Sequence, residues 1–248
     1  MRKAVLLFVL NLALFAQSAQ DVARISYEKI SGYGSSISQT TMILENAKGD
    51  KNIRKIEIRR LEGKNGDKSL LTFLYPNDLK GTKLLSYEVI GGDDHQWLYL
   101  PALKRVKRIS SRNKSGSFMA SEFSYEDISS QNYKNYSYSG DAKVVQKEGK
   151  SYFELLRVPK DAHSGYSKQI IYIDIKAYLA RFGEYYDKQK RLLKKIYFLD
   201  YTSLDGIQRV HKILIKNVQN KKHSSLIWDS DSVKAGLRKR DFAKRVLR

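Results

Sequence analysis

A period of two in the hydrophobic pattern most constrains how this chain can fold. In residues 37–44, Met42 and Leu44 share one face of an extended chain, while Ile43 lies on the other. Side chains two residues apart share a face of a β-strand, and the turn-forming sequence at residues 48–51 ends the segment. The pattern recurs, and it predicts strands over residues 37–44, 53–61, 69–75, 82–89, 96–100, 106–110, 142–146, 151–158, 167–174, 179–186, 192–201, 206–218 and 224–229.

The regions between these strands are too short for crossover helices. One amphipathic helix is predicted over residues 21–33, with Asp21 as its N-cap and Gly32 near its end. Residues 111–140 are rich in Ser, Asn and Tyr, which predicts an irregular segment with one helical turn near residues 121–128. A parallel α/β fold is therefore disfavoured. The sequence predicts a mainly β fold, a single curved antiparallel sheet or barrel with a short N-terminal helix.

The start of the chain has the three-part layout of a secretory signal peptide. Arg2 and Lys3 precede an apolar run that is too short to span a bilayer, and small residues follow around Ser18. We expect residues 1–18 to be removed, with cleavage near Ser18/Ala19, and a buried N-terminal helix is the alternative. Residues 19–248 show no repeat or linker and are expected to form a single domain. Because no cysteine follows the cleavage site for lipid attachment, an exported, soluble protein is predicted.

Cations strongly outnumber anions in this chain. Lys and Arg total 46 against 26 Asp and Glu, and the formal net charge is +20. Such a surplus favours an anionic partner, and an exported protein meets phospholipid surfaces rather than nucleic acid. The chain contains no cysteine, which excludes disulfides, thiolate metal sites and cysteine nucleophiles.

No pattern in the sequence indicates catalysis. The four histidines are scattered, without the spacing of metal ligands. Asp93-Asp94-His95 is a compact polar cluster that could bind a cation, but the adjacent Gly91 and Gly92 favour a hairpin turn. The sequence contains no nucleophile elbow, zinc-protease motif or phosphate-binding glycine loop. We therefore expect no enzymatic activity, no cofactor and no metal.

The sequence also contains two basic clusters, Lys104, Arg105, Lys107 and Arg108 in a predicted strand, and Arg238, Lys239 and Arg240 near the end of the chain. One interpretation is a sheet edge that positive charge protects from pairing with other sheets. The other interpretation is contact with lipid phosphates or another anionic partner. The sequence leaves both interpretations open.

A long stretch of the chain resembles a known family. The most specific segments are Phe73-Leu74-x-Pro76-x-Asp78-x-Lys80-Gly81-Thr82, Asp93-Asp94-x-Gln96-Trp97-Leu98-Tyr99-Leu100-Pro101-Ala102-Leu103-Lys104-Arg105-Val106-x-Arg108-Ile109 and Ser115-Gly116-Ser117-Phe118-Met119-x-Ser121-x-Phe123-x-Tyr125-Glu126-Asp127. Together they resemble the outer membrane lipoprotein-sorting protein family of the LolA-like superfamily, whose members carry lipids and lipoproteins. Weaker similarity extends to Asp241-Phe242-Ala243-x-Arg245, so the resemblance covers nearly all of the predicted mature chain.

This resemblance implies a half-open, unclosed β-barrel with small covering helices and an apolar concave face that holds an acyl chain. It also implies a periplasmic location, beside an inner-membrane transporter of the resistance-nodulation-division type in many members. We therefore expect a non-enzymatic carrier or sensor of lipid or lipoprotein acyl chains. An adaptor for an envelope transporter or assembly machine, with its cavity filled by its own side chains, is the alternative. A lipid-modifying hydrolase is disfavoured.

Strand alternation supplies the candidate cavity residues. Trp97 and Tyr99 share one face of their strand while Leu98 lies on the other, so both faces are apolar. Phe118 and Met119 follow a glycine closely and are expected to cover the opening. The predicted ligand-binding set is Met42, Leu44, Ile56, Ile58, Leu71, Phe73, Leu85, Tyr87, Trp97, Tyr99, Phe118 and Met119. For each of these residues, ordinary packing in the core is the alternative.

Overall fold

The computed structural model describes residues 17–129 and 131–247. Residues 1–16, which make up most of the predicted signal peptide, lie outside the described residues. Within the described part of the chain, no helix is both long enough and apolar enough to cross a membrane.

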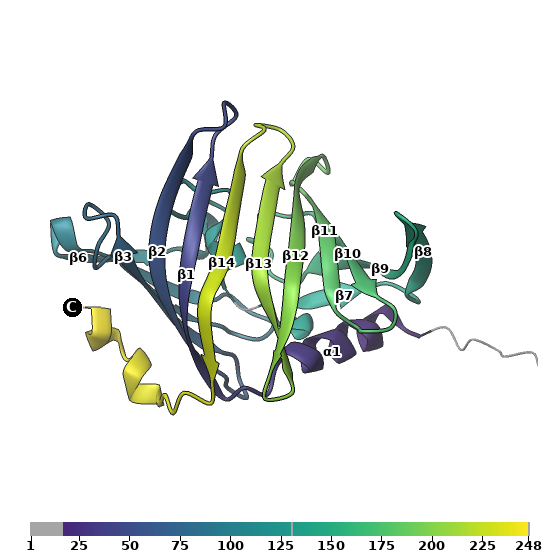
Figure 1. Ribbon diagram of the computed structural model, residues 1–248, viewed down its shortest axis with the longest axis horizontal. Helices are drawn as coiled ribbons and strands as arrows, with labels where there is room; N and C mark the ends of the chain where they lie inside the picture. Colours follow the sequence, from purple (N-terminus) through teal and green to yellow (C-terminus); the bar gives the residue numbers. More distant parts are fainter. Residues whose placement is uncertain (1–16, 130, 248) are drawn as a thin grey trace, which may run out of the picture.

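Fourteen strands form one sheet in which every pair is antiparallel (Figure 1). The strands are β1 Ser35–Glu45, β2 Lys51–Leu61, β3 Lys68–Tyr75, β4 Lys83–Tyr87, β5 His95–Leu100, β6 Arg105–Ile109, β7 Tyr136–Tyr138, β8 Lys143–Lys147, β9 Lys150–Pro159, β10 Lys168–Asp174, β11 Ala180–Tyr186, β12 Leu192–Leu204, β13 Ile207–Asn217 and β14 His223–Val233. Their order is β6-β5-β4-β3-β2-β1-β14-β13-β12-β11-β10-β9-β7, and β8 also pairs with β9. The first and last strands therefore meet at the centre of the sheet.

The sheet is curved and does not close into a barrel. β6 and β7 lie at its two ends, and no strand pairing joins them in the described part of the chain. Most neighbouring strands are consecutive in the sequence and are joined by hairpins, as the turn signals between the predicted strands indicate. The predicted mainly β, half-open architecture is confirmed.

Helix α1 spans Ala19–Ile30 and begins earlier than the sequence pattern predicts. Its N-cap is Ser18 rather than Asp21, because the backbone N–H of Asp21 donates a hydrogen bond of 3.0 Å to Ser18 Oγ. The carbonyl of Gln17 accepts a hydrogen bond of 2.8 Å from the Ala142 N–H, which ties the start of α1 to the segment before β8. Helix α1 then crosses beside β7, β9 and β13, on the concave face of the sheet (Figure 1).

The segment between β6 and β8 is largely irregular and carries small helices, as predicted. They are the 3₁₀ helices η1 Pro101–Leu103, η2 Ser111–Asn113, η3 Phe118–Ala120 and η4 Tyr133–Asn135, and the short α-helix α2 Tyr125–Ile128. One element was missed, because residues 136–138 form β7, which pairs with β9. Three residues are too few to display a period of two in a sequence. Their pairing depends on β9, which follows later in the chain.

Apolar side chains pack on both faces of the sheet. The larger core lies on the concave face, where Phe123 and Ile128 of the covering segment join strand residues such as Ile56. The smaller core lies on the outer face of β3, β4 and β5 and includes Leu85 and Trp97. The sheet therefore has two buried surfaces, one under α1 and α2 and one under the end of the chain.

The C-terminal tail, residues 235–247, covers the smaller core. Its 3₁₀ helices, η5 Lys239–Phe242 and η6 Lys244–Leu247, place the fully buried side chains of Phe242 and Leu247 against the sheet. Lys83 Nζ donates a hydrogen bond of 2.6 Å to the Val246 carbonyl. The tail is thus a packed part of the domain (Figure 1).

Candidate ligand cavity

A cavity of about 270 Å³ lies between α1 and the concave face of the sheet. Helix α1 supplies Ala23 and Ile30, the covering segment supplies Phe123 and Ile128, and strands from both halves of the sheet supply most of the remaining apolar wall. The apolar strand residues that line the cavity include Ile58, Leu71, Leu155, Ile171, Ile173, Ile196, Phe198, Ile213, Leu226 and Trp228. This volume is near the lower end of the roughly 300–1,000 Å³ that small-molecule pockets occupy.

Strand alternation positions this wall. Ile171 and Ile173 lie two residues apart on β10, and Ile196 and Phe198 have the same spacing on β12. Gly183 of β11 lies between these two strands. A Cβ atom on Gly183 would come within 2.8 Å of Ile171 Cδ1 and 3.3 Å of Ile196 Cγ2. The missing side chain lets the neighbouring isoleucines meet over β11.

One part of the cavity wall is polar and contains Asp127, Ser129, Gln131, Tyr138, Arg157 and Tyr185. Asp127 is held by a buried ion pair, because Lys194 Nζ lies 2.5 Å from its Oδ2 and both side chains are only 4% exposed. The hydroxyl of Tyr166 donates a hydrogen bond of 2.8 Å to Asp127 Oδ1. These contacts fix α2, which carries Asp127, to β12.

Charged side chains at strand ends form another part of the wall. Arg209 Nε donates a hydrogen bond of 2.6 Å to Asp231 Oδ2, so this guanidinium has its counter-ion within the sheet. Glu62 accepts hydrogen bonds from the backbone N–H groups of Gly32 and Gly34, at 2.8 and 2.7 Å. Glu62 thus joins the segment after α1 to the end of β2 and holds the helix over the cavity.

Of the predicted ligand-binding residues, Ile58 and Leu71 line this cavity. Met42, Ile56, Phe73 and Phe118 are fully buried in the larger core, and Leu44 and Met119 pack against that core. These six residues are not part of the cavity wall. Ile56 and Phe73 lie two residues from Ile58 and Leu71 on the same strands, so they share the concave face with the cavity wall and pack in the core beside it.

The remaining predicted residues, Leu85, Tyr87, Trp97 and Tyr99, lie away from the cavity. Leu85 pairs with Trp97 across β4 and β5, so both side chains project from the outer face of the sheet. There they meet the C-terminal tail, and Lys244 Nζ lies 4.3 Å from the Trp97 ring centroid. Both faces of β5 are apolar because Leu98 packs in the larger core on the concave face and Trp97 packs in the smaller core on the outer face.

Phe118 and Met119 occupy a well-packed turn. The Phe118 ring contacts the Phe73 and Tyr125 rings, with centroid separations of 5.9 and 5.4 Å. The Met119 carbonyl accepts a hydrogen bond of 2.5 Å from Arg54 Nη1. These contacts fix η3 against β2 and β3, and neither Phe118 nor Met119 is among the residues that line the cavity.

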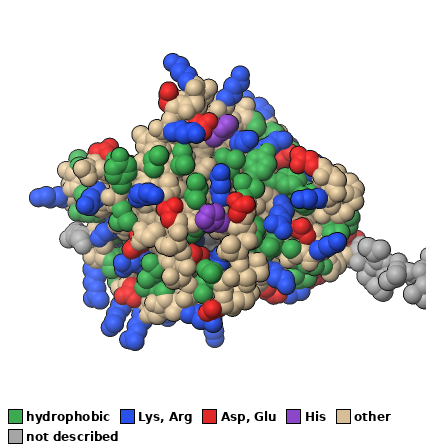
Figure 2. Space-filling model, in the orientation of Figure 1, with side chains coloured by type: hydrophobic (Ala, Val, Ile, Leu, Met, Phe, Trp, Pro, Cys, Tyr) green, Lys and Arg blue, Asp and Glu red, His purple; other side chains and the backbone are tan. Residues whose placement is uncertain are grey.

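The side chains of both predicted basic clusters are exposed. Lys104, Arg105, Lys107 and Arg108 lie on or beside the edge strand β6, and Arg238, Lys239 and Arg240 lie in the C-terminal tail. The tail contacts β5 through Lys244 and Trp97, and β5 pairs with β6, so the two clusters occupy neighbouring parts of the surface. In Figure 2, Lys and Arg side chains project at the lower left, where Figure 1 places the tail.

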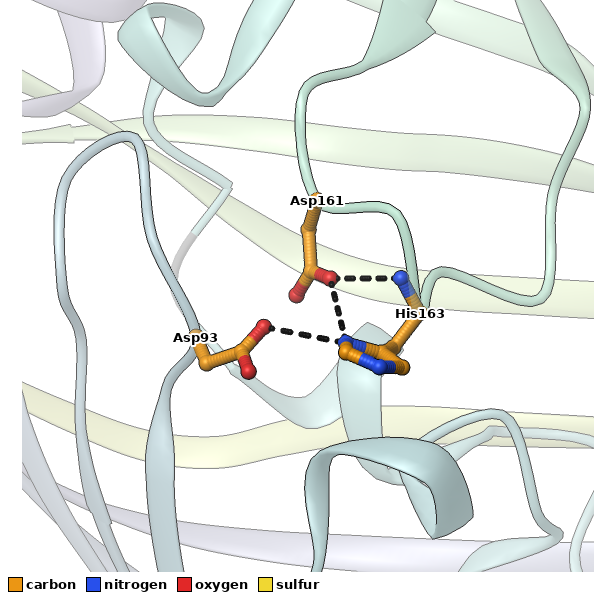
Figure 3. A group of neighbouring side chains, drawn as sticks. All are labelled: Asp93, Asp161 and His163. Atoms are coloured by element: carbon orange, nitrogen blue, oxygen red, sulfur yellow. Dashed lines mark hydrogen bonds and ion pairs between the residues drawn. The ribbon is translucent and has the colours of Figure 1, made fainter.

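Asp93 takes part in a group that its sequence neighbours did not reveal. Its carboxylate and that of Asp161 converge on the His163 ring, with Nδ1–Oδ1 distances of 3.5 and 3.6 Å (Figure 3). These residue types can ligate a metal ion, and their ligand atoms lie within 4.8 Å of one another. However, the Lys114 ammonium group forms an ion pair with Asp161, so the positive charge that a metal ion would supply to this carboxylate is already present. The group joins the β4–β5 loop to the β9–β10 loop.

Glu126, next to Asp127 on α2, is another buried carboxylate. Burial, and to a smaller extent the neighbouring charge of Asp127, raise the pKa of Glu126 to about 7, although a hydrogen bond of 2.8 Å from the Gly165 N–H opposes the shift. Near neutral pH the Glu126 carboxyl group is therefore present in both protonated and ionised forms, next to Asp127 of the polar wall.

Comparisons with known proteins agree with this architecture. A family model described as that of an uncharacterized protein matches residues 65–248. Among solved structures, an outer membrane lipoprotein-sorting protein domain from Vibrio parahaemolyticus has a TM-score of 0.86 and 40% sequence identity, and the match covers 92% of this chain and 97% of that chain. No curated protein matches this chain.

Two further structures extend the comparison. A DUF1329 family protein from Desulfovibrio piger has a TM-score of 0.86 and 28% identity over 93% of this chain and 98% of that chain. A LolA superfamily protein from Nitrosomonas europaea shares the fold, with a TM-score of 0.77 and 17% identity over 93% of this chain and 100% of that chain. On the identity and coverage of the Vibrio domain, this chain belongs to the outer membrane lipoprotein-sorting protein family. It shares the fold of the LolA superfamily protein.

Proposed function

We propose that this protein is a periplasmic carrier or sensor that binds lipid or lipoprotein acyl chains in the cavity between α1 and the sheet. The observation that carries the proposal is the apolar cavity wall, to which strands from both halves of the sheet contribute. Each methylene group moved from water into such a wall contributes about 0.8 kcal/mol. The similarity to a lipoprotein-sorting domain supports the same type of ligand.

The proposal includes export and a membrane encounter, and it includes no catalytic step. The basic residues of β6 and the tail are proposed to contact anionic phospholipid headgroups, since each cation near such a surface contributes about 1 kcal/mol. Contacts of Gln17 and Ser18 with the domain favour a mature protein that retains these two residues.

Mass spectrometry of protein recovered from the cell envelope tests the proposal. The intact mass should correspond to a chain that begins within a few residues of Ala19, and an organic extract should contain acyl lipids. After delipidation, the protein should take up lipid from vesicles, faster from anionic than from neutral vesicles at low salt, because exposed charges are screened beyond about 10 Å at 0.1 M. An intact Met1, or an extract without acyl lipid together with no uptake from vesicles, would contradict the proposal.

The alternative function is an adaptor for an inner-membrane transporter or assembly machine. The observation that favours it is the exposed β6 edge, where Leu103 is 62% and Val106 is 37% exposed beside the basic cluster. An edge strand offers unpaired backbone groups to another chain. Failure to take up lipid, together with binding of a transporter domain that Val106→Lys abolishes, would favour this alternative.

A further inference from the structure

Arg157 is a buried cation that forms no ion pair with any of the residues that the structure describes. Its side chain projects from β9 into the polar wall of the cavity, and the residue is 9% exposed. Arginine stays protonated in proteins, so burial cannot remove its charge. In the described part of the chain, no carboxylate lies within ion-pair distance of the Arg157 guanidinium.

The groups that contact Arg157 are neutral at physiological pH. Its Nε donates a hydrogen bond of 2.7 Å to Gln169 Oε1, and its Nη2 lies 3.2 Å from Gln131 Oε1 and 3.3 Å from the Tyr185 hydroxyl. The Tyr136 ring lies beneath the guanidinium, 3.8 Å from Cζ. Burial raises the pKa of Tyr185 to about 12, so this hydroxyl is un-ionised at neutral pH.

Asp127, a carboxylate of the same polar wall, does not balance this charge. Asp127 is already neutralised by Lys194 and accepts further hydrogen bonds from Tyr166 and from the Ser124 N–H. A charge that is removed from water without a partner is unfavourable, and a ligand that supplies the opposite charge gains the interaction. The Arg157 guanidinium therefore offers an unbalanced positive charge to an anionic ligand in the cavity.

We propose, resting on the acyl-binding function above, that the natural ligand is an acidic amphiphile whose carboxylate or phosphate pairs with Arg157 while its chain contacts the apolar wall. Guanidinium groups bind both anions through charge-assisted hydrogen bonds. Acyl chains attached only through esters or amides carry no such group. The cavity should therefore prefer a free fatty acid or a lipid phosphate to a neutral acyl ester.

Titration calorimetry with laurate, methyl laurate and lauryl phosphate, which carry the same chain, tests this preference. We expect laurate to bind roughly tenfold to hundredfold more tightly than methyl laurate, the range for a hydrogen bond to a charged group. Comparison of laurate with lauryl phosphate then distinguishes a carboxylate ligand from a phosphate ligand. Equal affinities for laurate, lauryl phosphate and methyl laurate would overturn the proposal and leave acyl binding intact. No binding of any of the three would contradict the proposed function itself.

Variants of two arginines locate the anion. Arg157→Met should reduce laurate affinity to that of methyl laurate, and Arg157→Lys should retain part of the preference. Arg60 also lines the cavity and has no ion-pair partner among residues 17–129 and 131–247, but it is more exposed, so Arg60→Met is the matched control and should keep the preference. Loss of the preference in Arg60→Met but not in Arg157→Met would overturn the assignment. The wild-type comparison tests the preference even if Arg157→Met fails to fold.

Discussion

Phe73→Ala is expected to lower the free energy of unfolding by about 3–5 kcal/mol, the range for removal of a buried aromatic ring. Phe73 of β3 is fully buried, and its ring packs against that of Phe118 at a centroid separation of 5.9 Å. It also belongs to the larger core, with Met42 and Ile56, and it is not among the residues that line the cavity. The truncation would create a void that this close-packed region cannot fill by small movements.

The matched control for this prediction is Phe198→Ala. Phe198 of β12 is only partly buried and faces the existing cavity. Its truncation enlarges a space that is already present, so we expect a loss of under about 2 kcal/mol and weaker binding of acyl ligands. Urea denaturation monitored by circular dichroism measures both variants. Similar losses of stability in the two would contradict the distinction between core and cavity wall.

Lys194→Met is expected to have a comparable effect, about 3–5 kcal/mol, because it leaves the buried Asp127 carboxylate without its cation. The two side chains are each 4% exposed, and Lys194 Nζ also donates a hydrogen bond of 3.1 Å to the Glu122 carbonyl. The double variant Asp127→Asn/Lys194→Met should be more stable than Lys194→Met alone, because it removes the unpaired charge. If the double variant is no more stable, the loss arises from packing and not from charge.

The adjacent residue provides the control for Lys194. Lys195 projects to the opposite face of β12 and pairs with Glu184 at 3.5 Å, with its side chain 41% exposed. Exposed ion pairs of this kind contribute about 0–1 kcal/mol. Chemical denaturation of Lys195→Met should therefore show a small change. A loss as large as that of Lys194→Met would indicate that β12 is sensitive to any substitution.

The fold was predictable from the sequence because strand alternation and turn signals are local. Residues 37–44 alternate with a period of two and a turn follows at residues 48–51. In the structure β1 covers the alternating residues, and β2 begins at the end of the turn. The motifs around Trp97 and Phe118 indicated a half-open sheet through their resemblance to the family. The β1–β14 pairing at the centre of the sheet, between the two ends of the chain, had no local signal.

The cavity was harder to predict because alternation shows which side chains share a face and not which face is concave. Leu85 and Trp97 satisfy the same pattern as Ile58, but the C-terminal tail covers them on the outer face. Alternation in the second half of the chain, as in Ile171 and Ile173, carried an equally strong signal for the cavity wall.

The polar features of the site depend on contacts between distant segments. Arg157 lies within an ordinary alternating strand, and its neutral surroundings among the described residues appear only when β9 packs beside residues 131–136. Asp93 likewise meets His163 across a sequence separation of 70 residues. Spacing rules apply within a helix or a strand, so they could not find either arrangement.

Quenching of the two tryptophans tests most directly whether an acyl chain occupies the cavity. Trp228 lines the cavity, whereas Trp97 lies on the outer face beneath the tail, and the chain has no other tryptophan. Bromine quenches tryptophan emission only at close contact, so laurate brominated at its terminal carbon reports which side chain the ligand reaches, with unbrominated laurate as the control. We predict saturable quenching in Trp97→Phe, which retains Trp228, and none in Trp228→Phe. Quenching of Trp97 alone, equal quenching of both residues, or no quenching of Trp228 at saturation would contradict binding in this cavity.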